Sequence, residues 1–282
     1  MNNAVVIIAY LQTPSSIELA SFSQCLKILY NHDIIIACPY SLNVETYERI
    51  IKQNNANVIF ERFEDENFIS ISSYNKLKKS ILFYERFIKY KYILIYHLDA
   101  WVFKDELDFW CNKNFDYIGA PWYTSKGEML NAAGNGGFSL RKVSTFYKLL
   151  TGEYQKCLYA NIIFFLNIIK HYFLSFDFKR LIKNIYFFIF KCRLSILKYA
   201  FFYKEENEDY SYYRFFLLYP LTKIASSKKA LSFSFERFPE DLYNKNNSIL
   251  PFGCHGFYKY NPNFWKHFIP ELNIYLNKEV TA

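Results

Sequence analysis

Short apolar runs alternate with longer segments of helical spacing along the first part of the chain. The strand-like runs, rich in Ile and Val, are residues 5–9, 33–38 and 57–60. The segments in which apolar residues recur with helical spacing are 15–30, 44–53 and 72–90. Because strands that alternate with helices form βαβ units, the pattern predicts an α/β fold with a mostly parallel central sheet flanked by helices.

A fourth apolar run, residues 92–103, contains a single acidic residue, Asp99. The run is aromatic and β-branched, which is typical of a buried strand, and we expect this strand to end at Asp99. An unpaired carboxylate is costly to bury, so Asp99 is expected to hold a metal, a sugar hydroxyl or a positive partner. An ordinary strand-end carboxylate is the alternative.

The composition fits one large domain over residues 1–282, or one domain with a sizeable insertion. Hydrophobic residues make up 52% of the chain, and Gly and Pro number only 8 each, which argues against disorder. The chain lacks the glycine-rich phosphate loop of P-loop enzymes, and no G-x-G-x-x-G follows the first strand. P-loop enzymes and dinucleotide dehydrogenases are therefore disfavoured.

The cysteines and the N-terminus indicate a cytosolic protein. The 6 cysteines form no C-x-x-C pair, which predicts reduced thiols rather than disulfides or a zinc site. No basic region precedes the first apolar run, so a signal peptide is not expected.

Residues 156–204 form a basic, aromatic-rich segment that predicts a helical insertion. It holds nine basic residues and one acidic residue, a net +8 that equals the formal charge of the whole chain. No apolar stretch here approaches the roughly 18–20 residues that span a bilayer. Such a segment suits peripheral contact with an anionic membrane, and packing against the core is the alternative. No nucleic-acid motif accompanies it, so nucleic-acid binding is not expected.

Three further clusters carry candidate chemistry. Gly134, Gly136 and Gly137 mark either a hairpin turn or a loop that approaches a ligand closely. Glu208 and Asp209 form an acidic pair that would also favour a helix start. Taken alone, each cluster is a weak signal, and so is the single His255 between glycines.

The order of these clusters resembles that of the GT-A glycosyltransferases, in which a nucleotide-sugar lies across the ends of parallel strands. The segment from His97 through Asp99 to Trp101 stands at the place of the DxD motif of that fold. Residues 134–138 stand at its glycine loop, residues 207–209 at its xED motif, and His255 at its late metal-binding histidine.

More narrowly, the chain resembles a bacterial family of uncharacterised GT-A-like proteins from polysaccharide and lipopolysaccharide gene clusters. The segments that carry this resemblance are residues 97–101, 116–122, 134–141 and 252–257. The resemblance covers residues 4–150 and 205–258 and does not explain the insertion. It implies an inverting hexosyltransferase that moves a sugar from a nucleotide-sugar, usually UDP-linked in this fold, to a hydroxyl of a surface-glycan or lipid-linked acceptor. Such an enzyme would work in the cytoplasm at the inner face of the cytoplasmic membrane.

The resemblance also implies roles for individual residues. Asp209 would be the general base, and Glu208 would orient the acceptor or tune Asp209. Asp99 and His255 would hold a divalent cation, Mn²⁺ or Mg²⁺, at the donor diphosphate. The expected donor-binding residues are Ala9, Tyr10, His97, Asp99, Gly136, Gly137 and Arg141.

Two tryptophans leave alternatives open. Trp101 stands where the DxD motif has a second carboxylate, so the need for a metal is open, and Arg141 is a candidate cationic substitute. Trp122 would stack on a sugar or lie in the core. The alternative function is a catalytically inactive GT-A-like protein that binds a glycan or a membrane. A phosphoryl-transfer enzyme fits less well, because only Asp99 ends a predicted strand.

Overall fold

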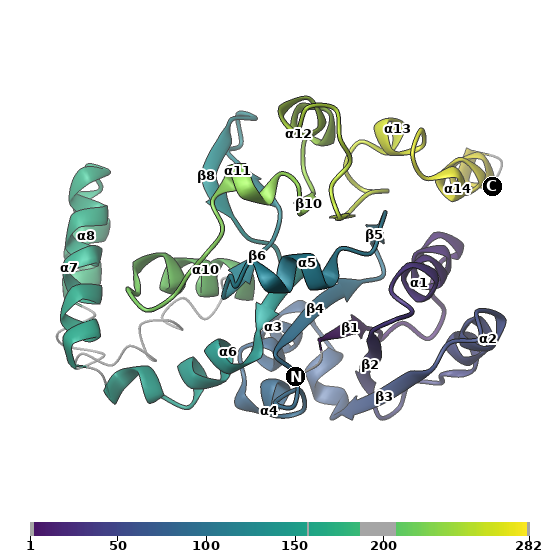
Figure 1. Cartoon of the computed structure of the whole chain (residues 1–282), viewed down its shortest axis with the longest axis horizontal. Helices are drawn as coiled ribbons and strands as arrows, with labels where there is room; N and C mark the ends of the chain where they lie inside the picture. Colours follow the sequence, from purple (N-terminus) through teal and green to yellow (C-terminus); the bar gives the residue numbers. More distant parts are fainter. Residues whose placement is uncertain (1–2, 157, 187–206, 281–282) are drawn as a thin grey trace.

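The computed structural model describes residues 3–156, 158–186 and 207–280 (Figure 1). Its central sheet is formed by β1 (Ala4–Ile8), β2 (Asp33–Pro39), β3 (Val58–Phe63), β4 (Tyr92–His97), β6 (Tyr117–Ile118) and β9 (Phe138–Lys142). The strand order is β3-β2-β1-β4-β9-β6. The first four strands are parallel, and β9 runs antiparallel to both β4 and β6. The predicted α/β fold with a mostly parallel sheet is therefore confirmed.

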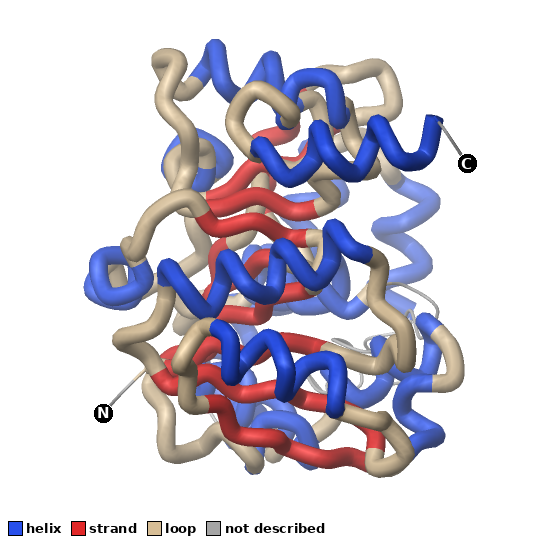
Figure 2. The backbone as a smooth tube through the Cα atoms, turned by 90° about the vertical axis from the view of Figure 1, so that its right-hand side faces the viewer, coloured by secondary structure: helices blue, strands red, loops and turns tan. Residues whose placement is uncertain are grey.

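Helices cover both faces of this sheet. On one face lie α1 (Ser16–Ile28), α2 (Glu45–Gln53) and α5 (Leu107–Asn112), and on the other α3 (Ile71–Lys78), α4 (Ile81–Glu85), α6 (Val143–Leu150) and α10 (Glu208–Leu218). Figure 2 shows the strands stacked edge to edge, with α1 and α2 in front of them.

The alternation of side chains along the strands builds a separate core on each face. Val5 of β1 lies in the core that includes Phe22 of α1. The next residue, Val6, lies in the other core, with Phe146 of α6. Since both faces are buried, the strands are apolar throughout rather than alternating, as the sequence pattern indicated.

Two predicted elements are divided in the structure. The predicted helix over residues 72–90 is two helices, because Ser80 accepts a hydrogen bond from the amide of Phe83 and so caps a new helix, α4. The predicted strand of residues 92–103 is also two strands, β4 and β5 (Ala100–Val102). Asp99 lies in the turn between them, at the carboxyl end of β4, where the chain leaves the central sheet.

The strand β5 belongs to a second sheet, together with β10 (Ser234–Phe235) and β11 (Gly253–His255). A separate two-stranded sheet is formed by β7 (Pro121–Tyr123) and β8 (Met129–Ala133). The short helices of this region are α11 (Ser227–Ala230), α12 (Pro239–Lys245), α13 (Pro262–Trp265) and α14 (Pro270–Val280). Because β11 pairs with β5, His255 lies opposite Ala100 and next to the turn at Asp99.

The described part of the insertion is helical. It forms α7 (Leu158–Leu174) and α8 (Phe178–Tyr186), which pack on each other at one end of the molecule (Figure 1). Phe164 and Ile168 of α7 are fully buried in the same core as α6 and α10. One side of α7 therefore packs against the core, which was the alternative to membrane contact. The remainder of the insertion, residues 187–204, lies outside the described residues. Among the residues that the structure describes, no helix is long and apolar enough to cross a bilayer.

Candidate functional site

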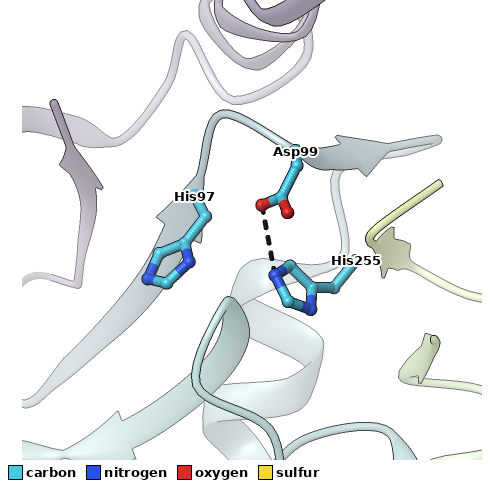
Figure 3. A group of neighbouring side chains, drawn as sticks. All are labelled: His97, Asp99 and His255. Carbon is cyan, nitrogen blue, oxygen red and sulfur yellow. Dashed lines mark ion pairs between the residues drawn. The ribbon is translucent and has the colours of Figure 1, made fainter. Parts of the chain in front are cut away.

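Three potential metal ligands meet where the two larger sheets adjoin. His97 is the last residue of β4, Asp99 lies in the turn after it, and His255 is the last residue of β11. One ligand atom from each of the three residues lies within 4.8 Å of the others (Figure 3). The pairing of β5 with β11 brings His255 to a turn that is more than half the chain away in sequence.

Asp99 is bonded to a basic group at each of its carboxylate oxygens. Nε2 of His255 lies 3.1 Å from Oδ1, and the Lys259 ammonium donates a hydrogen bond to Oδ2 at 2.6 Å. Burial acts to raise the pKa of Asp99, but His255, His97 and Lys259 lower it well below its usual range. Asp99 is thus ionised and holds the positive partner that its burial requires.

His255 is fixed by groups from three different segments. Its Nε2 contacts Asp99, and its Nδ1 lies 2.9 Å from Oε1 of Glu236 and 3.1 Å from Nδ2 of Asn135. Burial acts to lower the pKa of His255, but Asp99 and Glu236 raise it to about 10. The ring is therefore held as an imidazolium between two carboxylates, and it would have to release the proton on Nε2 to bind a metal ion.

His97 differs from His255 because its surroundings favour the neutral ring. Burial and the nearby Lys78 ammonium hold the pKa of His97 well below its usual value. The hydroxyl of Tyr74 lies 2.7 Å from Nε2, and the backbone amide of His97 donates to the carbonyl oxygen of Gly137. A neutral imidazole is the form that can bind a metal ion.

The donor set of the cluster fits Mn²⁺ better than Mg²⁺. It offers two imidazoles and one carboxylate, from His97, His255 and Asp99. Mg²⁺ prefers oxygen ligands, whereas Mn²⁺ also accepts imidazole nitrogen. The second carboxylate of a DxD motif is replaced here by a histidine that precedes Asp99 rather than by a residue that follows it.

The glycine loop passes close beneath this cluster. A Cβ atom on Gly137 would lie 2.0 Å from Nε2 of His255, and one on Gly136 would lie 2.9 Å from Oε1 of Glu208. Glycine is needed at both positions because protein side chains fill the space. The hairpin alternative is wrong, since β8 and β9 on either side of the loop belong to different sheets.

Glu208 lies in a buried ion network behind the loop. Its Oε1 is 2.8 Å from the Lys78 ammonium and 2.7 Å from Nη2 of Arg141, and only 2% of its side chain is exposed. Arg141 is completely buried and also donates to the hydroxyl of Tyr84. Arg141, expected at the donor, is therefore enclosed in the core, where it holds Glu208 in place.

Asp209 follows Glu208 in the first turn of α10 but has a different environment. Its side chain is partly exposed, and its Oδ1 accepts a hydrogen bond from the amide of Tyr210. Burial and the neighbouring Glu208 carboxylate raise the pKa of Asp209 to about 6. The expected pair of acidic residues is thus one buried, ion-paired carboxylate and one carboxylate that titrates near neutral pH.

Two cavities adjoin these groups. One, of about 110 Å³, is lined by Tyr10, Tyr74, His97, Asp99 and Lys259. A larger one, of about 620 Å³, is lined by Trp122, Asp209, Tyr210, Glu236 and Tyr260, among others. A chain of contacts links their walls, because Glu236 of the larger cavity contacts His255, and His255 pairs with Asp99 of the smaller cavity. Ala9 is fully buried and does not line the smaller cavity, which Tyr10 and Ile8 border instead.

The structure places the two tryptophans apart. Trp122 lines the larger cavity and packs on Tyr213, at 4.8 Å between ring centres. Trp101 is buried in β5 and packs on Phe257, so it lies away from the cluster. Five further residues contact the site although the sequence pattern did not indicate them: Tyr74, Lys78, Asn135, Glu236 and Lys259. Only Asn135 carried a signal, through its place within the glycine cluster.

The fold and the site define an α/β protein with a His/Asp cluster at the carboxyl edge of a mostly parallel sheet. The chain belongs to the family described as "Protein of unknown function (DUF5672)", whose sequence profile matches residues 57–255. No curated protein matches the chain.

Solved structures resemble parts of the chain at low identity. The core-mannan synthase A of Aspergillus fumigatus, in an Mn/GDP form, is 12% identical over 44% of this chain and 43% of its own, with a TM-score of 0.37. A cytidylyltransferase from Leptospira borgpetersenii serovar Hardjo-bovis is 12% identical over 54% of this chain and 64% of its own, with a TM-score of 0.36. HddC from Yersinia pseudotuberculosis is 15% identical over 52% of this chain and 80% of its own, with a TM-score of 0.34. The chain thus spans less than two thirds of the first two structures.

The buried ion network generates a prediction about stability. Replacing Glu208 by Gln should lower the free energy of unfolding by about 3–5 kcal/mol, because Lys78 and Arg141 would then be buried without their common anion. Urea unfolding followed by circular dichroism measures this loss. Glu240→Gln, which neutralises an exposed carboxylate of α12, is the matched control and should change stability by less than about 0.5 kcal/mol. Equal effects of the two substitutions would show that the network contributes little.

The ligand cluster generates a second prediction. The protein should bind Mn²⁺ more tightly than Mg²⁺, and Asp99→Asn should weaken Mn²⁺ binding at least tenfold by removing the only carboxylate of the cluster. Isothermal titration calorimetry measures the affinities. Asp105→Asn is the control, since Asp105 also pairs with a histidine, His32, outside the cluster. Identical Mn²⁺ titrations for both variants would exclude the cluster as the metal site.

Proposed function

We propose that the protein is an inverting glycosyltransferase that moves a hexose from a nucleotide-sugar to an acceptor hydroxyl, with Asp209 as the general base. The observation that carries this proposal is the adjacency of the two cavities. One is lined by His97 and Asp99 of the cluster, and the other has Asp209 in its wall. A transfer between two substrates needs a site for each and a base on the acceptor side.

The smaller cavity suits the nucleotide end of a donor. Tyr10 is half exposed at the end of β1 and can stack on a nucleobase. Negative charge grows on the departing diphosphate, and the Lys259 ammonium and the His255 imidazolium are positive groups beside it. A Mn²⁺ ion held by His97, Asp99 and His255 would take the place of the imidazolium charge, because His255 must lose a proton to bind the ion.

Asp209 has the properties of a general base. With a pKa of about 6 it is mostly ionised at neutral pH and more basic than an ordinary Asp. The carboxylate of Glu208, fixed by Lys78 and Arg141, contributes to this basicity from the protein interior. Glu208 is therefore a positioning and tuning residue in this mechanism, and it does not touch the acceptor.

The larger cavity suits a sugar of the acceptor. Trp122, Tyr210 and Tyr260 supply aromatic faces, on which sugar rings stack, beside the carboxylate of Asp209. We place this acceptor on a surface glycan or a lipid-linked precursor at the inner face of the cytoplasmic membrane. The support for this placement is the helix pair α7–α8, which exposes Phe173, Leu174 and Phe176.

One observation favours a catalytically inactive binding protein as the second candidate. Both oxygens of Asp99 are already bonded to His255 and Lys259, which neutralise the carboxylate within the protein. A domain that retained nucleotide or glycan binding without transfer would show the same contacts. Donor hydrolysis and sugar transfer with a panel of nucleotide-sugars distinguish the two candidates.

The assignment of the base predicts the behaviour of one variant. Asp209→Asn should reduce the rate of transfer or donor hydrolysis by about 10²–10⁴-fold. It should not reduce stability, because the raised pKa means that the ionised carboxylate opposes folding at neutral pH and the amide removes that charge. For the same reason, kcat/KM of the unmodified protein should fall as the pH drops through about 6. Asp108→Asn on α5 is the control, and unchanged turnover in Asp209→Asn would overturn the assignment.

Membrane contact through α7–α8 predicts binding to anionic vesicles. The protein should sediment with vesicles that contain phosphatidylglycerol, and replacing Lys179 and Lys183 by Glu should release it, since each basic side chain contributes about 1 kcal/mol at such a surface. The same exchange at Lys27 and Lys52, on α1 and α2, is the matched control. If the Lys179 and Lys183 variant sediments with the vesicles as fully as the control variant and the unmodified protein, the helix pair serves packing alone.

A further inference from the structure

The larger cavity contains two arginines that the proposed chemistry does not use. Arg180 comes from α8 in the insertion, and Arg237 follows β10. Both side chains line the same cavity of about 620 Å³ as Asp209 and Trp122, although they come from segments far apart in the chain. Both arginines are exposed to solvent, so their guanidinium groups are accessible to a negatively charged ligand in the cavity.

The acidic groups nearby do not supply that partner fully. Arg180 is 3.8 Å from Asp177, three residues earlier in the chain, which is at the limit of an ion pair. Arg237 lies over the ring of Tyr260 at 5.5 Å, and among the described residues no ion pair to a carboxylate involves it. Glu236 and Asp209 line the cavity too, but Glu236 is engaged by His255, and no ion pair joins Asp209 to either arginine in the part of the chain that the structure describes.

The chemistry of the lining identifies a class of ligand. A guanidinium presents a planar fork of N–H donors that matches a carboxylate or a phosphate, and it forms stronger hydrogen bonds to these anions than to neutral groups. The aromatic faces of Trp122 and Tyr260 in the same cavity suit the ring of a sugar. A cavity of this size is within the usual range for a ligand of one or a few rings.

We propose that the acceptor is an anionic saccharide, whose carboxylate or phosphate is bound by Arg180 and Arg237 while Asp209 faces its attacked hydroxyl. This inference rests on the proposed glycosyltransferase function and deepens it. It also gives the insertion a part in the site, because α8 supplies Arg180. The anion is either an acidic group of the glycan itself or the phosphate that links a sugar to a lipid carrier.

Binding of small probes tests the proposal without requiring transfer. The probes are p-nitrophenyl β-glucuronide, which carries a carboxylate, glucose 1-phosphate, which carries a phosphate, and the neutral p-nitrophenyl β-glucoside. Calorimetry on the full chain should show that at least one anionic probe binds roughly tenfold more tightly than the neutral one. The preferred anion distinguishes an acidic glycan from a phosphate-linked acceptor.

The variants Arg180→Gln and Arg237→Gln should each reduce this preference about three- to tenfold, and the double variant should abolish it. Binding of the neutral glucoside should not change. Arg49→Gln, which alters an exposed arginine of α2, is the matched control and should retain the full preference.

Two results would overturn the anion subsite. One is the absence of an anion preference: the charged and neutral probes bind equally, or no probe binds measurably at millimolar concentration. The other is an anion preference that survives in the double variant. The proposed function fails separately: if anion-selective binding persists but no nucleotide-sugar is hydrolysed or transferred, the subsite stands and the glycosyltransferase assignment is wrong.

Discussion

The ion pair between Asp99 and His255 joins the two larger sheets of the molecule at the point where the candidate site forms. The central sheet ends at His97, the chain turns at Asp99, and β5 then pairs with β11, which ends at His255. A buried ion pair is tolerated only where further hydrogen bonds compensate for lost hydration. Here the Lys259 ammonium donates to the carboxylate, and Nδ1 of the imidazolium lies within hydrogen-bonding distance of Glu236. The position of the turn, the glycine loop and the cavities all depend on this junction.

The neighbouring carboxylates of Glu208 and Asp209 show how one helix start provides two chemical roles. Glu208 points inward to Lys78 and Arg141, which keep it ionised. Asp209 borders the cavity, and burial together with the charge of Glu208 raises its pKa to about 6. Pairs of titratable groups whose environments push their pKa values apart are a recurrent feature of sites for acid–base chemistry.

The sequence predicted the elements that depend on local pattern, and it missed the contacts that depend on long-range pairing. The alternation of apolar runs was enough to predict the parallel strands, and the cost of burying a carboxylate pointed to Asp99. Lys259 and Glu236 carry no local signal, because only the β5–β11–β10 sheet brings them to Asp99 and His255. Arg141 was expected at the donor for its place after the glycine loop, but that place is within a strand buried on both faces.

The absence of a second carboxylate two residues after Asp99 has a physical explanation in the turn. The chain leaves the central sheet directly after Asp99, so Trp101 already belongs to β5 and its side chain is buried against Phe257. A carboxylate at that position would be buried in an apolar core without a partner, at a cost of several kcal/mol. Further ligands of a cation must therefore come from elsewhere, and the structure offers His97 from the strand before the turn and His255 from β11. A cluster with two imidazoles and one carboxylate suits Mn²⁺, which also accepts imidazole nitrogen, better than Mg²⁺, which prefers oxygen ligands.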